Sequence, residues 1–180
     1  MNRQGWLILV TGGSRSGKSR FAVELAKGCG PRIVYLATCQ AADQEMRQRI
    51  ARHRRQRPAR WRTIEHPADP AQVVARLNGT SDGLILDCLT MYVAQLVVAG
   101  ASDAAIERQV RRLCAAIRRA PYPVILVTNE VGSGVVPEFP MGRRFRDLAG
   151  LANQTAAALA DEVYLLVAGI PTRLKERSPG

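Results

Sequence analysis

The sequence is poor in aromatic residues, has no long hydrophobic run and carries its cysteines singly. Aromatic side chains make up 5% of the residues, which argues against a surface that binds single-stranded nucleic acid by stacking its bases. The longest apolar stretch, Val163 to Ile170, is much shorter than the roughly 20 residues that cross a bilayer. The 4 cysteines form no C-x-x-C pair, and neither of the 2 histidines lies at ligand spacing from one, so no zinc site or disulfide framework is expected. This pattern predicts a cytoplasmic protein with reduced thiols and no membrane insertion.

The chain is long enough to build one hydrophobic core. It has 180 residues, 47% of them hydrophobic, and a domain of this size buries roughly 70% of the surface that its unfolded chain exposes. No repeat, low-complexity tract or long linker interrupts the sequence. We therefore predict a single domain over residues 1–180, in which residues 171–180 form a frayed, polar tail.

Most of the excess positive charge lies in one segment. The chain has 26 Lys and Arg against 15 Asp and Glu, a net charge of +11. Eight arginines and no acid occur from Arg47 to Arg62, which leaves 18 basic and 15 acidic residues elsewhere. Arginine favours bidentate recognition of phosphate, but a solvated helix face explains such a charge run equally well.

Short apolar runs alternate along the chain with segments of helical spacing. This alternation predicts an α/β fold with a mostly parallel sheet and helices on both faces. The predicted strands are Trp6–Thr11, Arg32–Ala37, Leu84–Cys88, Pro123–Thr128 and Val163–Ala168. The predicted helices are Gly17–Gly28, Asp43–Gln56, Pro70–Leu77, Thr90–Ala99, Asp103–Arg119 and Met141–Ala160.

A phosphate-binding motif directly follows the first predicted strand. The pattern G-x-x-x-x-G-K-[ST] is matched by Gly12, Gly13, Ser14, Arg15, Ser16, Gly17, Lys18 and Ser19. In such a P-loop the backbone N–H groups and the N-terminus of the next helix bind phosphate oxygens. Lys18 would then reach the β- and γ-phosphates, and the Ser19 hydroxyl would bind Mg²⁺. The sequence therefore predicts a three-layer, P-loop NTPase-like fold that binds a nucleoside triphosphate.

A P-loop requires a second acidic group for its metal ion, placed at the end of a neighbouring strand. Asp87 ends a predicted strand, so we assign it to the metal with Ser19; an N-cap of the following helix is the alternative. Glu130 follows the fourth predicted strand and is a rival acid near the same sheet edge. No N-K-x-D tetrapeptide occurs, which argues against a signalling GTPase.

His53 lies inside the arginine-rich segment. On a helix it shares one face with Met46, Ile50 and Arg57, so it is expected to face the body of the protein or a cleft. The surrounding arginines disfavour its protonation, which leaves one ring nitrogen with a lone pair at pH 7. A neutral imidazole can attack phosphorus, although a partly buried packing histidine fits this spacing as well.

Further segments join the P-loop and His53 in one pattern: Tyr35–Thr38, Glu45–Met46, Arg49–Ile50, Arg57–Pro58, Trp61–Thr63, Glu65, Thr128–Gly132, Val136–Glu138, Arg144–Asp147, Gly150, Asn153–Gln154 and Ala160–Val163. Together they resemble the bifunctional adenosylcobinamide kinase / adenosylcobinamide-phosphate guanylyltransferase family. The similarity covers nearly the whole chain. The segment around His53 and the Thr-Asn-Glu-Val-Gly run are its most specific parts.

The resemblance implies two reactions on one scaffold. In the first, ATP or GTP phosphorylates the aminopropanol hydroxyl of adenosylcobinamide. In the second, His53 attacks the α-phosphorus of GTP, releases pyrophosphate and forms a guanylyl-histidine, from which GMP passes to adenosylcobinamide phosphate to give adenosylcobinamide-GDP. Lys18 and His53 are the implied catalytic residues, and Mg²⁺ is the implied cofactor.

The resemblance also implies the surroundings of the substrates. Glu65 is expected to pair with the N1–H and N2 amino groups of guanine, and the segment from Phe139 to Arg143 to help shape the corrinoid site. A homotrimer that binds no nucleic acid is implied as well. The remaining implied nucleotide-binding residues are Ala37, Thr38, Cys39, Arg54, Arg55, Gln56, Arg57 and Asp87.

Two other functions fit parts of the sequence. A nucleic-acid-binding P-loop ATPase would use the arginine-rich segment to bind phosphates along a strand, and its affinity would fall steeply with salt. A simple P-loop kinase of a small metabolite would use His53 only for packing. The second alternative predicts that His53→Ala leaves all activity intact.

Overall fold

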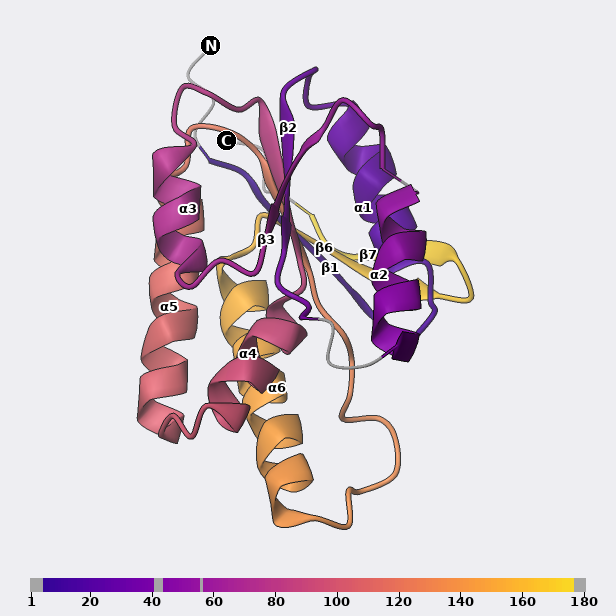
Figure 1. The fold of residues 1–180 in the computed structure, drawn as a ribbon, viewed down its shortest axis with the longest axis vertical. Coiled ribbons are helices and arrows are strands. Elements are labelled where there is room, and N and C mark those ends of the chain that lie inside the picture. Colours follow the sequence, from indigo (N-terminus) through magenta and orange to yellow (C-terminus); the bar gives the residue numbers. More distant parts are fainter. Residues whose placement is uncertain (1–4, 41–43, 56, 177–180) are drawn as a thin grey trace.

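A seven-stranded sheet forms the centre of the fold (Figure 1). The structure is a computed structural model that describes residues 5–40, 44–55 and 57–176, without the side chains of residues 45, 46 and 49. The strand order is β3-β2-β4-β5-β1-β6-β7; neighbours are parallel except for β6 and β7, which are antiparallel. The strands are β1 (Leu7–Gly12), β2 (Ile33–Ala37), β3 (Arg62–Glu65), β4 (Gly83–Asp87), β5 (Val124–Val127), β6 (Glu162–Val167) and β7 (Ile170–Lys175).

Helices cover both faces of the sheet (Figure 1), so the predicted α/β architecture is confirmed. One face carries α1 (Lys18–Lys27) and α2 (Gln44–Arg55). The other carries α3 (Pro70–Arg76), α4 (Leu89–Val98), α5 (Asp103–Arg119) and α6 (Pro140–Leu159). In the part of the chain that the structure describes, no helix combines the length and the apolar character needed to cross a membrane.

The two-residue period of the strands divides the core into two layers. In β1, Leu7 and Leu9 pack toward α3–α6, whereas Ile8 and Val10 pack toward α1. The alternation follows from the pleat of a strand, which turns successive side chains to opposite faces. The long helix α5 closes the first layer with a buried stripe, as its four- and three-residue spacing predicts; the stripe is Ile106, Val110, Leu113 and Ile117.

All six predicted helices and all five predicted strands are present, and no predicted end differs from the observed one by more than one residue. Residues Asp43 and Gln56, the predicted ends of the second helix, lie outside the described residues. Two strands were missed. β3 is a short edge strand of mixed polarity, and every residue of β7 is exposed. The predicted fraying of the tail was wrong for residues 171–175, because this segment pairs with β6; residues 177–180 lie outside the described residues.

Candidate active site

A cavity of about 820 Å³ opens at the carboxyl ends of the central strands. Parallel strands place their carboxyl ends at one edge of the sheet, where ligands of open α/β folds bind. The wall combines the P-loop with residues from α2, β3 and the segments that follow β2, β4 and β5. The predicted site residues that line it are Ser14, Arg15, Ser16, Gly17, Lys18, Ser19, Ala37, Cys39, His53, Arg57, Glu65 and Asp87.

The P-loop is held in shape by two glycines and by the β6–β7 hairpin. Gly12 has φ +147°, and a Cβ atom there would lie 2.4 Å from the Leu166 carbonyl oxygen. Gly17, the N-cap of α1, has φ 94°, a left-handed conformation that glycine adopts without strain. The Gly169 N–H of the hairpin turn donates to the Ser16 carbonyl at 3.0 Å. The turn that precedes the segment predicted to fray therefore supports the phosphate-binding loop.

Lys18 is folded over the loop that it belongs to. Lys18 is 7% exposed. Its Nζ donates to the Gly13 carbonyl at 2.6 Å and to Ser16 Oγ at 3.3 Å. A buried ammonium group is stable only with such partners. Phosphate oxygens placed in the loop can take over these hydrogen bonds, which is the arrangement that the motif predicts.

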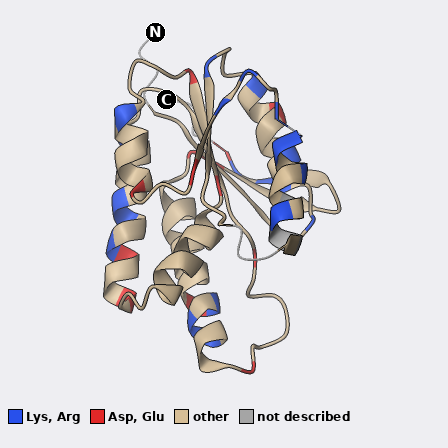
Figure 2. Ribbon diagram, in the orientation of Figure 1, with Lys and Arg blue, Asp and Glu red and all other residues tan. Residues whose placement is uncertain are grey.

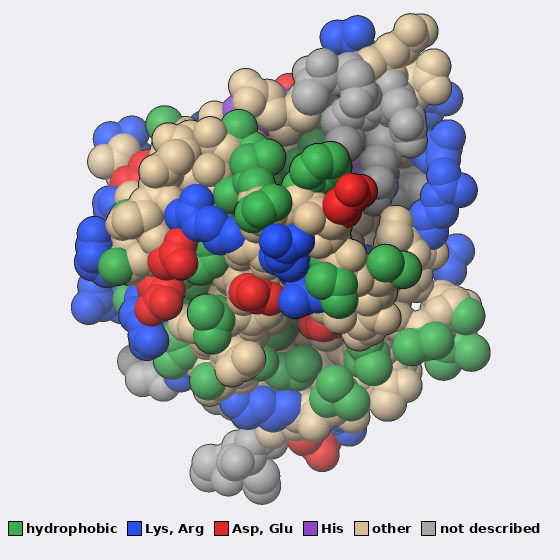
Figure 3. Space-filling model, turned by 90° about the horizontal axis from the view of Figure 1, so that it is seen from below, with side chains coloured by type: hydrophobic (Ala, Val, Ile, Leu, Met, Phe, Trp, Pro, Cys, Tyr) green, Lys and Arg blue, Asp and Glu red, His purple; other side chains and the backbone are tan. Residues whose placement is uncertain are grey.

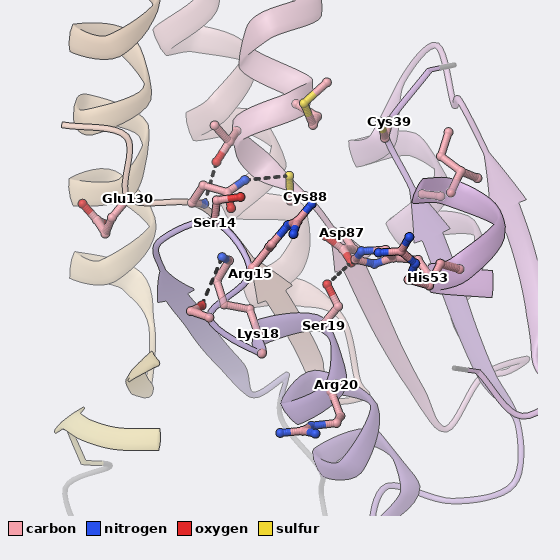
Figure 4. A pocket seen from close by; sticks show the side chains of 18 of the residues that line it. Ser14, Arg15, Lys18, Ser19, Arg20, Cys39, His53, Asp87, Cys88 and Glu130 are labelled. Atoms are coloured by element: carbon pink, nitrogen blue, oxygen red, sulfur yellow. Dashed lines mark hydrogen bonds and ion pairs between the residues drawn. The ribbon is translucent and has the colours of Figure 1, made fainter. Parts of the chain in front are cut away.

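Asp87 connects the P-loop to His53 (Figure 4). Ser19 Oγ donates to Asp87 Oδ2 at 2.8 Å, and Nδ1 of His53 lies 4.0 Å from the same oxygen. The N-cap of α4 is Cys88, so Asp87 does not cap that helix. The three side chains come from three different elements, α1, α2 and β4, and meet at one point of the cavity wall.

The Ser19 hydroxyl and the Asp87 carboxylate provide oxygen ligands of the kind that Mg²⁺ prefers. Among residues 5–40, 44–55 and 57–176, no group of three or more His, Cys, Asp and Glu side chains is arranged to hold a metal ion. Magnesium in nucleotide sites is commonly bound by one or two protein groups together with phosphates and water. The donor set therefore fits a magnesium ion that arrives with a nucleotide.

Tyr35 is a residue of the site for which the sequence predicted no separate role. Its hydroxyl donates to Asp87 Oδ2, and the Arg57 guanidinium carbon lies 3.3 Å from its ring centroid. Burial and the negative charge of Asp87 raise the pKa of Tyr35 well above 10.0, so its hydroxyl keeps its proton. A tyrosine in an otherwise apolar strand was the one available signal, since a buried hydroxyl requires a partner.

Thr38 has a structural role, and it does not line the cavity, so its contact with nucleotide stays a prediction. Its side chain is buried, and its Oγ1 donates to the Cys88 carbonyl at 2.7 Å and accepts from the Cys88 N–H at 2.8 Å. Burial and the adjacent Asp87 charge raise the pKa of the Cys88 thiol to about 12. The two hydrogen bonds between Thr38 and Cys88 hold the backbone next to Asp87 in place.

The predicted arginines after His53 differ in their positions. Arg57 lines the cavity, while Arg54 forms an exposed ion pair with Glu65 at 3.8 Å, and Arg55 is exposed. Within the described chain, Arg57 Nε is buried without a hydrogen-bond partner, so a bound anion can satisfy it. Gln56 lies outside the described residues. Basic residues recur along the length of α2 (Figure 2).

Glu130 lies on the opposite side of Lys18 from Asp87 and His53 (Figure 4). Its Oε1 accepts from Thr11 Oγ1 at 2.9 Å and from Asn153 Nδ2 at 3.0 Å. Its position after a predicted strand made Glu130 a rival of Asp87 for the metal. The separation instead gives the two acids different surroundings, because only Asp87 touches the P-loop serine.

Beyond Glu130 the cavity wall becomes apolar. Val131 and Phe145 line it, and the connection from β5 to α6 exposes large apolar side chains on the adjoining face. The exposed ones are Val135, Val136, Phe139 and Met141. Figure 3 shows several groups of hydrophobic side chains on the face seen from below, with charged side chains between them. An apolar surface next to a polar cavity is suited to a large, partly apolar ligand.

Comparison with known proteins assigns this arrangement to a family. The family described as cobinamide kinase / cobinamide phosphate guanyltransferase matches residues 8–174. The bifunctional adenosylcobalamin biosynthesis protein CobU of Salmonella typhimurium is 44% identical over 94% of this chain and 99% of its own length. CobU of Escherichia coli is 41% identical over the same shares, and CobP of Pseudomonas aeruginosa is 40% identical over 93% of this chain and 96% of its own.

Proposed function

The chain belongs to the cobinamide kinase / cobinamide phosphate guanyltransferase family of cobalamin biosynthesis, and we propose that both of its activities use the single cavity above the P-loop. The observation that carries this proposal is the convergence on Asp87 of Ser19 from the P-loop and His53 from α2. One nucleotide bound in the loop would have its phosphates within reach of both catalytic groups.

In the kinase reaction, the hydroxyl oxygen of adenosylcobinamide attacks the γ-phosphorus of ATP or GTP. The bond from that phosphorus to the oxygen that bridges it to the β-phosphate breaks, ADP or GDP leaves, and the hydroxyl proton is released. Lys18 stabilises the charge that develops on the phosphate oxygens, and the loop N–H groups orient them. Ser19 and Asp87 would hold Mg²⁺, whose contribution is to neutralise phosphate charge.

In the guanylyltransferase reaction, a ring nitrogen of His53 attacks the α-phosphorus of GTP and pyrophosphate leaves. A phosphate oxygen of adenosylcobinamide phosphate then attacks the same phosphorus, which forms adenosylcobinamide-GDP and restores the histidine. Arg57 supports this step, because its stacked guanidinium lies in the cavity wall with a buried N–H that is suited to a phosphate.

The two substrates are proposed to bind on opposite sides of Lys18. Glu65, on the same side as His53, is proposed to bind the guanine edge. The corrinoid is proposed to lie on the apolar face around Phe139, beyond Glu130 and Phe145. This arrangement leaves the phosphates in the middle, over Lys18.

The homotrimer stays a prediction, which light scattering of the purified protein would test.

The decisive experiment is incubation with Mg²⁺ and GTP labelled at the α-phosphate, followed by denaturation. We expect an acid-labile, alkali-stable label on the wild-type protein and none on His53→Ala. An His66→Ala variant is the matched control and should keep the label, because His66 is the only other histidine. A folded, GTP-binding protein without label would return His53 to a packing role and favour the simple kinase.

The kinase activity is tested separately with ATP labelled at the γ-phosphate and adenosylcobinamide. We expect label in the corrinoid product with both wild type and His53→Ala. Nucleic acid should neither compete nor become bound at moderate salt. Salt-sensitive nucleic-acid binding without corrinoid phosphorylation would favour the P-loop ATPase alternative.

A further inference from the structure

Three hydrogen-bond donors from three elements surround one oxygen of Asp87. Ser19 Oγ of α1 lies 2.8 Å from Oδ2, the Tyr35 hydroxyl of β2 donates to it, and His53 Nδ1 of α2 lies 4.0 Å away. The Ser19 contact belongs to the P-loop motif. The contact between Asp87 and His53 lies outside that motif and has a separate chemical consequence.

The Asp87 carboxylate is fixed before any ligand binds. Its backbone is held by pairing with Ala37 on β2 and with Val127 on β5, and its carbonyl accepts from the Thr38 N–H at 3.0 Å. The carboxylate itself is held by Tyr35, which is 1% exposed. The position of Oδ2 is therefore set by the sheet, and the more exposed His53 ring adjusts to it.

A neutral imidazole carries its proton on one nitrogen and its lone pair on the other, and the nitrogen that faces a carboxylate keeps the proton. The nitrogen of His53 that faces Asp87 is Nδ1. The side chain of His53 is 33% exposed, so a small rotation can shorten the distance of 4.0 Å. Catalytic hydrogen bonds are often long in the free enzyme and tighten in the complex.

We propose that Asp87 is the positioning residue of His53: it holds the proton on Nδ1, so that Nε2 is the nitrogen that attacks the α-phosphorus. The inference rests on the proposed guanylyl transfer. A bond forms between Nε2 and phosphorus, the bond to the pyrophosphate oxygen breaks, and the Nδ1 proton stays in place facing Asp87. The carboxylate then stabilises the positive charge that the ring acquires.

The same carboxylate would thus serve both reactions. Through Ser19 it belongs to the phosphate site of the kinase, and through His53 it orients the nucleophile of the guanylyl transfer. Arg57 stacked on Tyr35 extends this network to the residue that follows α2 by two positions.

The first test needs no nucleotide. Nitrogen-15 NMR of histidine-labelled protein, at a pH where both rings are neutral, reports which ring nitrogen carries the proton. We expect the Nδ1–H form for His53, assigned with His53→Ala, and the ordinary preference for Nε2–H at the exposed His66. In Asp87→Ala, His53 should shift to the Nε2–H form while the His66 signals stay unchanged.

An Nε2–H form of His53 in the wild-type protein would overturn the proposal, and this outcome is readable even if Asp87→Ala does not fold. The second test is the linkage in the labelled adduct. Phosphorus–nitrogen couplings should identify the Nε2-linked isomer, and an Nδ1-linked adduct would refute the role of Asp87 while leaving the guanylyl-histidine intact. Absence of any adduct would instead refute the proposed transfer.

Discussion

Thr38 and Cys88 exchange two hydrogen bonds across the ends of β2 and β4. The Thr38 hydroxyl donates to the Cys88 carbonyl at 2.7 Å and accepts from its N–H at 2.8 Å. Both groups are buried, so no solvent can replace the lost partner. This one hydroxyl therefore stabilises the turn that presents Asp87 to the cavity.

Replacing Thr38 by Val should destabilise the protein by about 2–4 kcal/mol, because it leaves a buried N–H and a buried carbonyl without a partner. Urea denaturation measures the difference. Thr38→Ser is the matched control, since it keeps the hydroxyl and should recover most of the lost stability. A Val variant as stable as wild type, beside a destabilised Ser variant, would show that the methyl group, and not the hydrogen-bond pair, is the important part of Thr38.

Lys18→Met should lower the rate of phosphoryl transfer about 10²- to 10³-fold, the usual effect of removing one preorganised donor from a developing charge. The variant should stay folded, because a buried cation is replaced by an apolar chain of similar length. Steady-state kinetics with labelled ATP measures the loss.

The matched control is Lys27→Met at the other end of α1. Lys27 forms an exposed ion pair with Glu24 at 2.8 Å. Such pairs contribute about 1 kcal/mol or less to the stability of a protein. Its kinetics should equal those of wild type. A comparable loss of activity in both variants would mean that the charge of α1 in general, and not contact with the phosphates, supports the reaction.

The sequence predicted those parts of the site that depend on local order. The P-loop is a contiguous motif, and Asp87 is recognisable as a carboxylate that ends an apolar run. The roles of Tyr35 and Thr38 depend instead on the register in which Ala37 pairs with Asp87. That register joins strands about 50 residues apart, and no spacing in the sequence encodes it. The distance between His53 and Asp87 has the same tertiary origin.

The missed strand β7 illustrates a different limit. Hydrophobic alternation marks a strand only when one of its faces is buried, and all six residues of β7 are exposed. Its pairing with β6 is directed by the turn at Ala168 and Gly169, both of which have positive φ. The turn residues alone, followed by a strand with no buried face, were not enough to predict the hairpin that supports the P-loop.

Glu65→Gln should weaken the use of GTP more than that of ATP. A carboxylate accepts from both N1–H and the N2 amino group of guanine, donors that adenine lacks, and hydrogen bonds to a charged group contribute about 1.5–3 kcal/mol. We expect KM for GTP in the guanylylation of His53 to rise about 10- to 100-fold. The KM for ATP in the kinase reaction should stay within about twofold of wild type.

Glu24→Gln is a suitable control for the loss of one negative charge, because Glu24 is exposed on α1 and paired with Lys27. It should change neither KM. An equal rise for ATP and GTP in Glu65→Gln would contradict recognition of the guanine edge. It would point instead to a general effect of releasing Arg54 from its ion pair with Glu65.

Replacing Phe139 by Ser should raise KM for adenosylcobinamide several-fold and leave the guanylylation of His53 by GTP unchanged. Phe139 is 72% exposed, so the protein loses little packing, while an apolar acceptor would lose a large contact surface. Val98→Ser, at an exposed position on α4, is the control. An unchanged KM in Phe139→Ser would place the corrinoid elsewhere.

The buried thiols make a prediction about alkaline pH. Burial raises the pKa of Cys88 to about 12 and that of Cys114 to about 11, from an ordinary value of 9.0. A raised pKa means that the folded state holds the proton more tightly than the unfolded state. The resulting stability is complete below pH 9 and is lost as the pH rises toward the folded-state value. The free energy of unfolding should therefore fall between pH 9 and pH 11.

Cys114→Ala isolates one thiol in this titration. The variant should be less stable than wild type at pH 8, because it leaves a small cavity in the core. Its loss of stability with pH should be shallower than that of wild type, by up to about 1.4 kcal/mol per pH unit. Urea denaturation at pH 8, 9, 10 and 11 gives both curves. If the curves are parallel, Cys114 ionises equally easily in the folded and unfolded chain, and its burial does not protect the thiol.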